Sequence, residues 1–105
     1  THNDLLPFMK NKKIRILQPD IMRGGYTNLI YTSHLANQYG IKIAPHMFPE
    51  LSIHIVASIE NPSWLEYMGW YDHLWQEPLI PVNGTLKPTN RPGHGMDFKT
   101  EIYTL

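Results

Sequence analysis

The sequence predicts an α/β fold in which short parallel strands alternate with helices. Three short apolar runs lie at residues 14–17, 41–44 and 64–67, and one helical pattern separates each run from the next. A strand, a helix and a second strand in this order form a right-handed crossover, which makes the two strands parallel. With 105 residues, the chain has room for one small domain at most.

The first quarter of the chain predicts a helix and a strand. Residues 3–12 begin with an Asn and an Asp, either of which can cap a helix, and the apolar side chains that follow form one helical face. This pattern is typical of a short helix. Residues 14–17 form a compact β-branched run that ends at Gln18-Pro19-Asp20, and this favours a buried strand. Arg23-Gly24-Gly25 then indicates a flexible turn.

A second helix and a second strand follow this turn. Thr27 or Asn28 can cap a helix whose apolar residues recur at helical spacing until Gly40 ends it. Residues 41–44 form the next predicted strand, which stops at Pro45-His46. Residues 14–44 therefore contain one complete strand–helix–strand unit.

The same order then repeats before the pattern changes. Pro49 opens a helix, Asn61-Pro62 ends it, and residues 64–67 form the third predicted strand. From residue 68 onward the chain is rich in proline and aromatic residues, and Asn83-Gly84 between apolar residues is a strong hairpin signal. We therefore expect an irregular, β-rich tail over residues 68–105.

Charge and composition exclude several classes of function. The 9 basic and 9 acidic side chains give a formal net charge of zero, so no long-range field attracts nucleic acid or a membrane surface. The absence of cysteine excludes disulfides, thiolate zinc sites and thiol nucleophiles. The most apolar stretch, residues 51–59, is much shorter than the roughly 20 residues of a membrane span. We expect a cytoplasmic protein with no nucleic-acid or membrane partner.

One ionisable side chain lies at or near the end of each predicted strand. Asp20 follows the first strand, His46 follows the second, and Glu66 lies within the third. Adjacent parallel strands bring their carboxyl ends to one rim, where α/β folds place ligands and catalytic groups. A carboxylate beside a histidine stabilises the protonated imidazole, which suits acid–base catalysis. Such residues also cap helices and satisfy loop backbones, so the pattern alone leaves a structural role open.

Six short motifs carry a family resemblance. Three lie in the predicted βα units, QPDIMRGG at 18–25, APHMFPE at 44–50 and WLEY at 64–67, and three lie in the tail, EPL at 77–79, NG at 83–84 and RPGHG at 91–95. In order and spacing they resemble the mandelate racemase group of the enolase superfamily. The resemblance implies a partial (β/α) TIM-type barrel, in which a C-terminal fragment supplies strands 6 to 8 with their helices. It implies that residues 1–67 are the last three βα units. Residues 68–105 would be a tail that packs back toward a capping domain absent from this chain.

The resemblance also implies roles for the three strand-end residues. Asp20 and His46 match the family's Asp–His dyad, in which His46 moves a proton on the carbon next to a substrate carboxylate, and Glu66 matches the family's acid. Muconate-cycloisomerase-like members place a lysine where this chain has Asp20, so that branch is excluded. Arg23 runs directly into Gly24, one residue fewer than the family commonly has. The family's Mg²⁺ ligands lie upstream of this sequence, so we expect Mg²⁺ as cofactor and no metal ligand among these residues.

The implied function is a Mg²⁺-dependent enzyme that removes the α-proton of a small carboxylate substrate. A sugar-acid dehydratase, which is a lyase, is the first choice, and a racemase or epimerase of a 2-hydroxy acid, which is an isomerase, is the second. A non-catalytic fragment that acts only in assembly is the third, because three barrel strands leave two open edges. The expected partners are the remainder of the barrel, the capping domain and further copies in a homo-oligomer, and the isolated chain is expected to be inactive.

Overall fold

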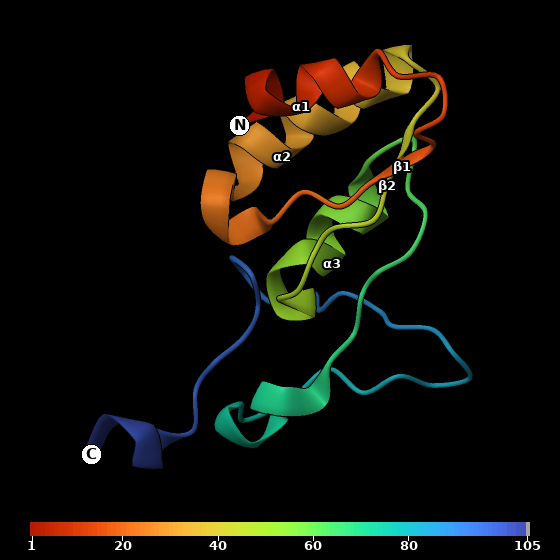
Figure 1. The fold of residues 1–105 in the computed structure, drawn as a ribbon. Coiled ribbons are helices and arrows are strands. Elements are labelled where there is room, and N and C mark those ends of the chain that lie inside the picture. The colour runs from red at the N-terminus through yellow and green to blue at the C-terminus, as the bar shows by residue number, and fades with distance from the viewer. Residues whose placement is uncertain (105) are drawn as a thin grey trace.

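The computed structural model describes residues 1–104 as helices packed around a small parallel sheet, followed by a long tail (Figure 1). The elements in chain order are α1 His2–Met9, β1 Ile16–Leu17, α2 Ile21–Gln38, β2 Lys42–Ile43, α3 Pro49–Ser58 and the 3₁₀ helices η1 Gly69–Leu74 and η2 Thr100–Thr104. In Figure 1, α1 lies along α2, and the tail runs below α3. The predicted α/β class and the alternation of the first five elements are confirmed.

β1 and β2 form a two-stranded parallel sheet. Their register pairs Ile16 with Lys42 and Leu17 with Ile43. Because side chains alternate along a strand, Leu17 and Ile43 share one face, and both are buried in the apolar core. Ile16 and Lys42 share the opposite face and are exposed. The parallel order predicted for the first two strands is therefore confirmed.

The third predicted strand, residues 64–67, is not a strand in the structure. The chain meets β2 earlier, through an isolated parallel bridge between Ile43 and Pro62. The backbone ladder does not extend further, because Pro45 has no N–H to donate and the Met47 N–H donates to a side-chain carboxylate instead. One strand pair and two isolated parallel bridges among the described residues, Ile43 with Pro62 and Asp20 with His46, make an α/β arrangement, and they do not establish a partial TIM barrel.

The helix expected to start at Thr27 or Asn28 starts earlier, at Ile21, and Asp20 is its N-cap. The predicted turn is present as a break inside α2 at Gly25, whose φ of 71° and ψ of −179° are not helical. Glycine adopts a positive φ without the steric cost that a Cβ would add. The first turn of α2 is therefore a separate short segment that follows Asp20 directly.

Three clusters of buried apolar side chains hold the elements together. They are Met9, Leu17, Ala36, Ile41 and Ile43; Ile21, Leu29 and Ile55; and Ile53, Leu79 and Met96. The first two join the helices to one another and to the sheet, and the third joins the tail to α3. Each fully buried large aliphatic side chain contributes about 1.5–3 kcal/mol. The loops that follow β1 and β2 are thus anchored at both ends.

The tail is irregular, as predicted, but it is not β-rich. The hairpin at Asn83-Gly84 is confirmed, because Val82 and Thr85 exchange backbone hydrogen bonds of 2.9 and 3.1 Å around it. The remaining antiparallel pairing among the described residues is a single bridge between Trp75 and Phe98. Four prolines in this segment lack the N–H that a sheet ladder needs, which accounts for the difference. No helix within residues 1–104 has the length and apolar character to span a bilayer.

Candidate active site

The parallel strands bring Asp20 and His46 next to each other. An isolated parallel bridge pairs the two residues, and the His46 N–H donates to the Pro19 carbonyl over 3.0 Å. This bridge continues the register of Ile16 with Lys42, so by alternation Asp20 and His46 belong to the exposed face of the strand pair. They lie at the carboxyl end of both strands, which is the end where α/β enzymes place their chemistry.

Glu66 lies against His46 although its segment is not a strand. Its Oε2 is 2.9 Å from His46 Nδ1, and it accepts the Met47 N–H over 2.6 Å. An ionised carboxylate can only accept, so with Glu66 ionised this contact requires a proton on Nδ1 and leaves Nε2 as the basic nitrogen of the neutral ring. The structure therefore places two of the three predicted residues in direct contact.

Asp20 has a structural task in addition to its place at the rim. Its Oδ1 accepts the Met22 N–H over 2.8 Å and so caps α2. Its Oδ2 lies 3.9 Å from Nε of Arg23, whose side chain is largely exposed, and such a pair contributes little. Within residues 1–104, no side-chain hydrogen bond joins Asp20 to His46. Asp20 therefore has the capping role that the sequence left open. The carboxylate that contacts His46 is that of Glu66.

The two residues after His46 adopt left-handed backbone conformations, which the sequence did not indicate. Met47 has a φ of 55° and Phe48 a φ of 48°. A residue with a Cβ pays about 1–2 kcal/mol for this region, and neither position is a glycine. The signal in the sequence is indirect: Pro49 disfavours the right-handed helical region for the residue before it. Strained residues of this kind gather at functional sites.

Two further acidic side chains lie just below the rim, where the tail packs on α3. Glu50 is 3% exposed, and its Oε1 accepts the Trp75 indole N–H over 3.2 Å. Asp72 accepts the Tyr67 hydroxyl over 2.8 Å. That hydrogen bond to Asp72 is the main cause that raises the pKa of Tyr67, and burial adds to it. Sequence reasoning did not single out this group, which attaches the segment after Glu66 to the tail.

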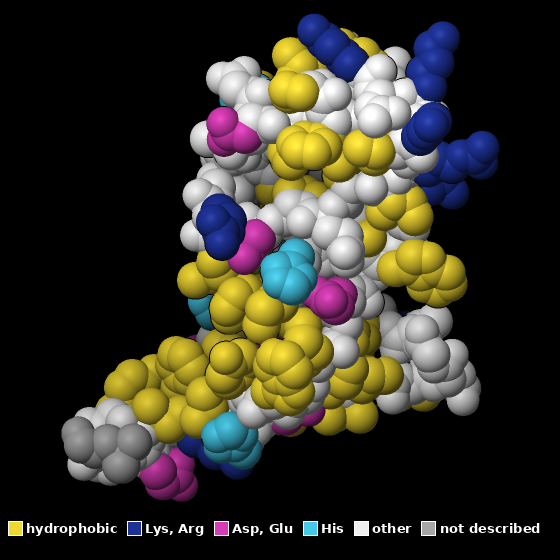
Figure 2. Space-filling model, in the orientation of Figure 1, with side chains coloured by type: hydrophobic (Ala, Val, Ile, Leu, Met, Phe, Trp, Pro, Cys, Tyr) yellow, Lys and Arg dark blue, Asp and Glu magenta, His cyan; other side chains and the backbone are white. Residues whose placement is uncertain are grey.

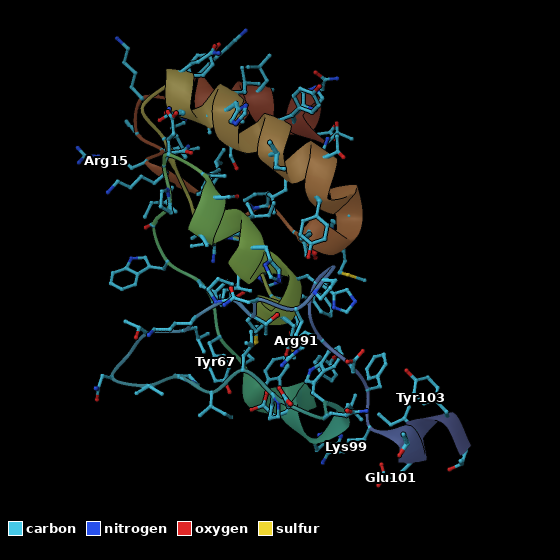
Figure 3. All side chains as sticks on the ribbon, turned by 180° about the vertical axis from the view of Figure 1, so that it is seen from behind. Arg15, Tyr67, Arg91, Lys99, Glu101 and Tyr103 are labelled. Atoms are coloured by element: carbon cyan, nitrogen blue, oxygen red, sulfur yellow. The ribbon has the colours of Figure 1, made fainter. Side chains whose placement is uncertain are left out.

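The opposite end of the strands is basic. Five exposed cations lie there, Lys10, Lys12, Lys13, Arg15 and Lys42, and none forms an ion pair within residues 1–104. Figure 2 shows dark blue side chains gathered at this end, and Figure 3 shows Arg15 far from Tyr67. A hollow of about 850 Å³ opens among these residues. It lies at the amino ends of β1 and β2, so it is not the place where this type of fold carries out catalysis.

The residues present do not make a magnesium site. Within residues 1–104, no group of three or more His, Asp or Glu side chains is arranged to hold a metal ion. Mg²⁺ requires near-octahedral oxygen coordination, which a carboxylate engaged in capping and a carboxylate engaged with His46 do not supply. The contact between His46 and Glu66 is of a kind that supports proton transfer.

A family model described as enolase C-terminal domain-like matches residues 1–102. The chain belongs to this family. The match confirms the resemblance to the mandelate racemase group, and a mandelate racemase/muconate lactonizing enzyme from Polaromonas sp. JS666 superimposes on 98% of the chain with a TM-score of 0.83 and 29% identity, covering 28% of that structure. The motifs at 18–25, 44–50 and 64–67 are therefore interpreted within the correct family.

Two dehydratases are among the proteins that this enolase-like chain resembles. An L-talarate/galactarate dehydratase from Salmonella typhimurium is 34% identical over 83 residues, which is 78% of this chain and 20% of that protein. An L-talarate dehydratase from Polaromonas sp. JS666, solved with Mg and L-glucarate, superimposes with a TM-score of 0.84 at 29% identity and covers 98% of this chain and 28% of that structure. The chain thus spans about a quarter of the length of these relatives.

Proposed function

We propose that this chain supplies acid–base residues to a Mg²⁺-dependent enzyme that removes the α-proton of a carboxylate substrate, and that the reaction is the dehydration of a sugar acid. The observation that carries the proposal is the contact between Glu66 and His46 beside Asp20, at the carboxyl end of a parallel strand pair. Two similar proteins are sugar-acid dehydratases, which supports the choice of a lyase.

His46 is the base in this proposal. Its Nδ1 proton is held by Glu66, so Nε2 accepts the proton from the carbon next to the substrate carboxylate. The C–O bond to the hydroxyl of the neighbouring carbon then breaks, the hydroxyl takes the proton that the His46 imidazolium now carries and leaves as water, and the enol that remains tautomerises to a keto acid. Glu66 stabilises the imidazolium that forms, in the manner of the carboxylate of a catalytic triad. Asp20, beside His46 on the adjacent strand, adds a second negative charge to the same region.

The support for magnesium comes from a similar solved structure and not from the residues of this chain. The solved L-talarate dehydratase holds Mg together with L-glucarate. Because residues 1–104 contain no suitable ligand group, we assign the metal to parts of the enzyme outside this chain. The 105-residue chain alone is then expected to be inactive even with added Mg²⁺, since loss of one electrostatic stabiliser typically costs on the order of a hundredfold or more in rate.

Assembly with further protein is the second part of the proposal. The side of β1 away from β2 has no strand beside it among the described residues, and an open strand edge pairs readily with another strand. We assign this edge to the remainder of a barrel, the tail to contact with a capping domain, and the whole to a cytoplasmic homo-oligomer. A chain that acts in assembly alone would pair in the same way without catalysis.

An isomerase is the alternative that one comparison favours. A 3,6-anhydro-alpha-L-galactonate cycloisomerase from Streptomyces coelicolor is 30% identical over 86 residues, which is 78% of this chain and 24% of that protein. A racemase or epimerase would use the same base to remove the α-proton but would return a proton instead of expelling water. The two reactions start with the same step and differ in the product.

Product analysis of the complete enzyme with a panel of sugar acids separates these possibilities. A dehydratase forms a keto acid with loss of water, and removal of Mg²⁺ with a chelator stops it. Formation of a stereoisomer of unchanged mass would favour the isomerase. An enzyme that exchanges no α-proton of any acid in the panel, with the metal present, would favour the assembly role and contradict the proposal.

A further inference from the structure

The turn that follows His46 is held by contacts from two directions. Met47 and Phe48 both have a positive φ. The Met47 N–H donates to Glu66 Oε2 over 2.6 Å, and the Met47 carbonyl accepts from Oγ of Ser52 over 3.2 Å. One residue therefore has its donor and its acceptor held by two side chains that come from different segments. Strained conformations persist where the surroundings determine them in this way.

Ser52 is placed to hold this turn and little else. It lies in the first part of α3, is completely buried, and its backbone N–H bonds the Phe48 carbonyl over 2.9 Å. Its hydroxyl reaches one residue further back, to Met47, instead of making the usual bond within the helix. A buried hydroxyl group costs free energy unless it is paired, so the bond to Met47 favours the conformation in which that carbonyl points at α3.

The orientation of His46 depends on this turn. β2 and the bridge to Asp20 fix the backbone before His46, and the left-handed turn fixes it after. The φ and ψ of Met47 set the angle between the peptide plane that carries its N–H and the plane that carries its carbonyl. If Met47 relaxed to a right-handed conformation, this angle would change, and the bonds to Glu66 and to Ser52 would not both be kept. With the Ser52 bond kept, Glu66 would lose the shorter of its two contacts, and its hold on the imidazole would weaken.

We propose that Ser52 is a positioning residue that keeps the left-handed Met47–Phe48 turn in place, and through it the pairing of Glu66 with His46. This inference rests on the proposed function in one respect, since its catalytic consequence assumes that His46 is the base. The structural part stands on the contacts of the chain itself. No contact of Ser52 with substrate is involved.

The first test uses the complete enzyme without substrate and needs no activity. Amide hydrogen exchange at Met47 is measured by NMR in the unaltered chain and in Ser52→Ala, with exchange expected to speed up by about tenfold or more in the variant. Ser33→Ala is the matched control, because Ser33 is equally buried and its Oγ donates to the Leu29 carbonyl over 2.7 Å, away from the rim. Equal effects of both substitutions on Met47 would contradict the proposal.

The second test asks whether the strain is the reason for Ser52. Glycine accepts a positive φ without penalty, so Met47→Gly should make the turn less dependent on the serine hydroxyl. In the complete enzyme, Ser52→Ala is expected to slow α-proton exchange about tenfold at little change in KM, and to slow it by less than about threefold in a Met47→Gly background. If Ser52→Ala slows α-proton exchange by the same factor in both backgrounds, Ser52 and Met47 act independently and the proposed coupling is refuted.

The outcomes separate this inference from the proposed function. If His46→Asn abolishes exchange of the substrate α-proton, but Ser52→Ala changes neither that rate nor the exchange rate of the Met47 amide, the positioning role is wrong and the base assignment stands. If Ser52→Ala frees the Met47 amide but His46→Asn leaves turnover normal, the turn is held as proposed and the function is wrong. Should Ser52→Ala fail to fold, Ser52→Cys, a similar volume with a weaker donor, is expected to give an intermediate exchange rate, and an unchanged rate would count against the proposal.

Discussion

Replacing Glu66 by glutamine tests the geometry of the site with a change of one atom type. Glu66 Oε2 accepts from both His46 Nδ1 and the Met47 N–H, over 2.9 and 2.6 Å. Both donors bond the same oxygen, so a glutamine amide oxygen in the place of Oε2 accepts from both with its two lone pairs. The amide is neutral, so both hydrogen bonds lose the contribution of the charge. The neutral imidazole keeps its Nδ1–H tautomer, whereas the imidazolium that forms when Nε2 takes a proton loses the negative charge that stabilises it.

The energetic cost follows from the same contacts. A hydrogen bond to a charged group contributes about 1.5–3 kcal/mol, and here the side chains of His46 and Glu66 are 46% and 35% exposed, so solvent screening reduces the net value. We expect Glu66→Gln to lower the free energy of unfolding by roughly 1–2 kcal/mol. For a domain of this size, that corresponds to a fall in Tm of roughly 4–16 °C.

Two measurements check this prediction. Nitrogen NMR of the imidazole, at a pH well above the usual histidine range, is expected to show the Nδ1–H tautomer of His46 in the unaltered chain and in Glu66→Gln, because the oxygen that accepts from Nδ1 is kept. Calorimetry gives the change in Tm. Glu101→Gln, at an exposed position in η2, is the control and should change neither. An Nε2–H tautomer in the unaltered chain would refute the reasoning, and so would a Glu66→Gln variant that changes to the Nε2–H tautomer or keeps the original Tm.

Three further changes have expected outcomes that denaturant titration can measure. Asp20→Ala removes the cap of α2 and should cost about 1 kcal/mol, whereas Asp20→Asn should keep most of it; equal losses would contradict the capping role. Asn61→Ala leaves two buried carbonyls without the hydrogen bonds of 3.0 and 2.8 Å that Asn61 now gives them, and about 2–4 kcal/mol should be lost; a loss below about 0.5 kcal/mol would count against this account. Folding raises the pKa of Tyr67 above 10.0, chiefly through the hydrogen bond to Asp72, so the folded state binds the phenol proton more tightly than the unfolded state does. The free energy of unfolding that this adds is present below pH 10 and should fall as the pH rises through the folded pKa. Tyr67→Phe should make this alkaline loss smaller, and an identical pH profile of stability would show that the group contributes nothing.

Local signals in the sequence predicted the order of the elements correctly. Apolar periodicity and the breaks at proline and glycine are properties of the nearest residues, and α1, β1, β2 and α3 follow them. The turn before the main part of α2 was predicted correctly, since the helix is broken at Gly25. The short first segment was missed because Asp20 was interpreted as a chemical group, whereas its side chain also caps that segment. A short Asp can perform either task, and the choice depends on where the next backbone N–H groups lie.

The third strand shows what local signals omit. Residues 64–67 have the aromatic and apolar character of a strand, but a strand exists only where a neighbour offers backbone partners. Beside β2 those partners end near Pro62, because Pro45 has no N–H and the Met47 N–H is taken by Glu66. The same contact that ends the ladder builds the candidate site.

The site itself was predictable as a region and not as a set of contacts. Strand order alone places Asp20 and His46 at one rim, and the bridge between them agrees. The partner of His46 depends on side-chain torsions and on the left-handed turn at Met47 and Phe48, for which no glycine gives a signal. Their roles in catalysis remain predictions that the contacts support.

The central claim is that His46 takes the α-proton of the substrate. The most direct measurement is exchange of that proton with deuterium from solvent, followed by NMR in the complete enzyme with His46 present and with His46→Asn. Because general-base catalysis typically contributes about 10²–10⁴-fold, the variant is expected to exchange at least a hundredfold more slowly while Mg²⁺ still binds. Exchange at a near-normal rate in His46→Asn would contradict the account.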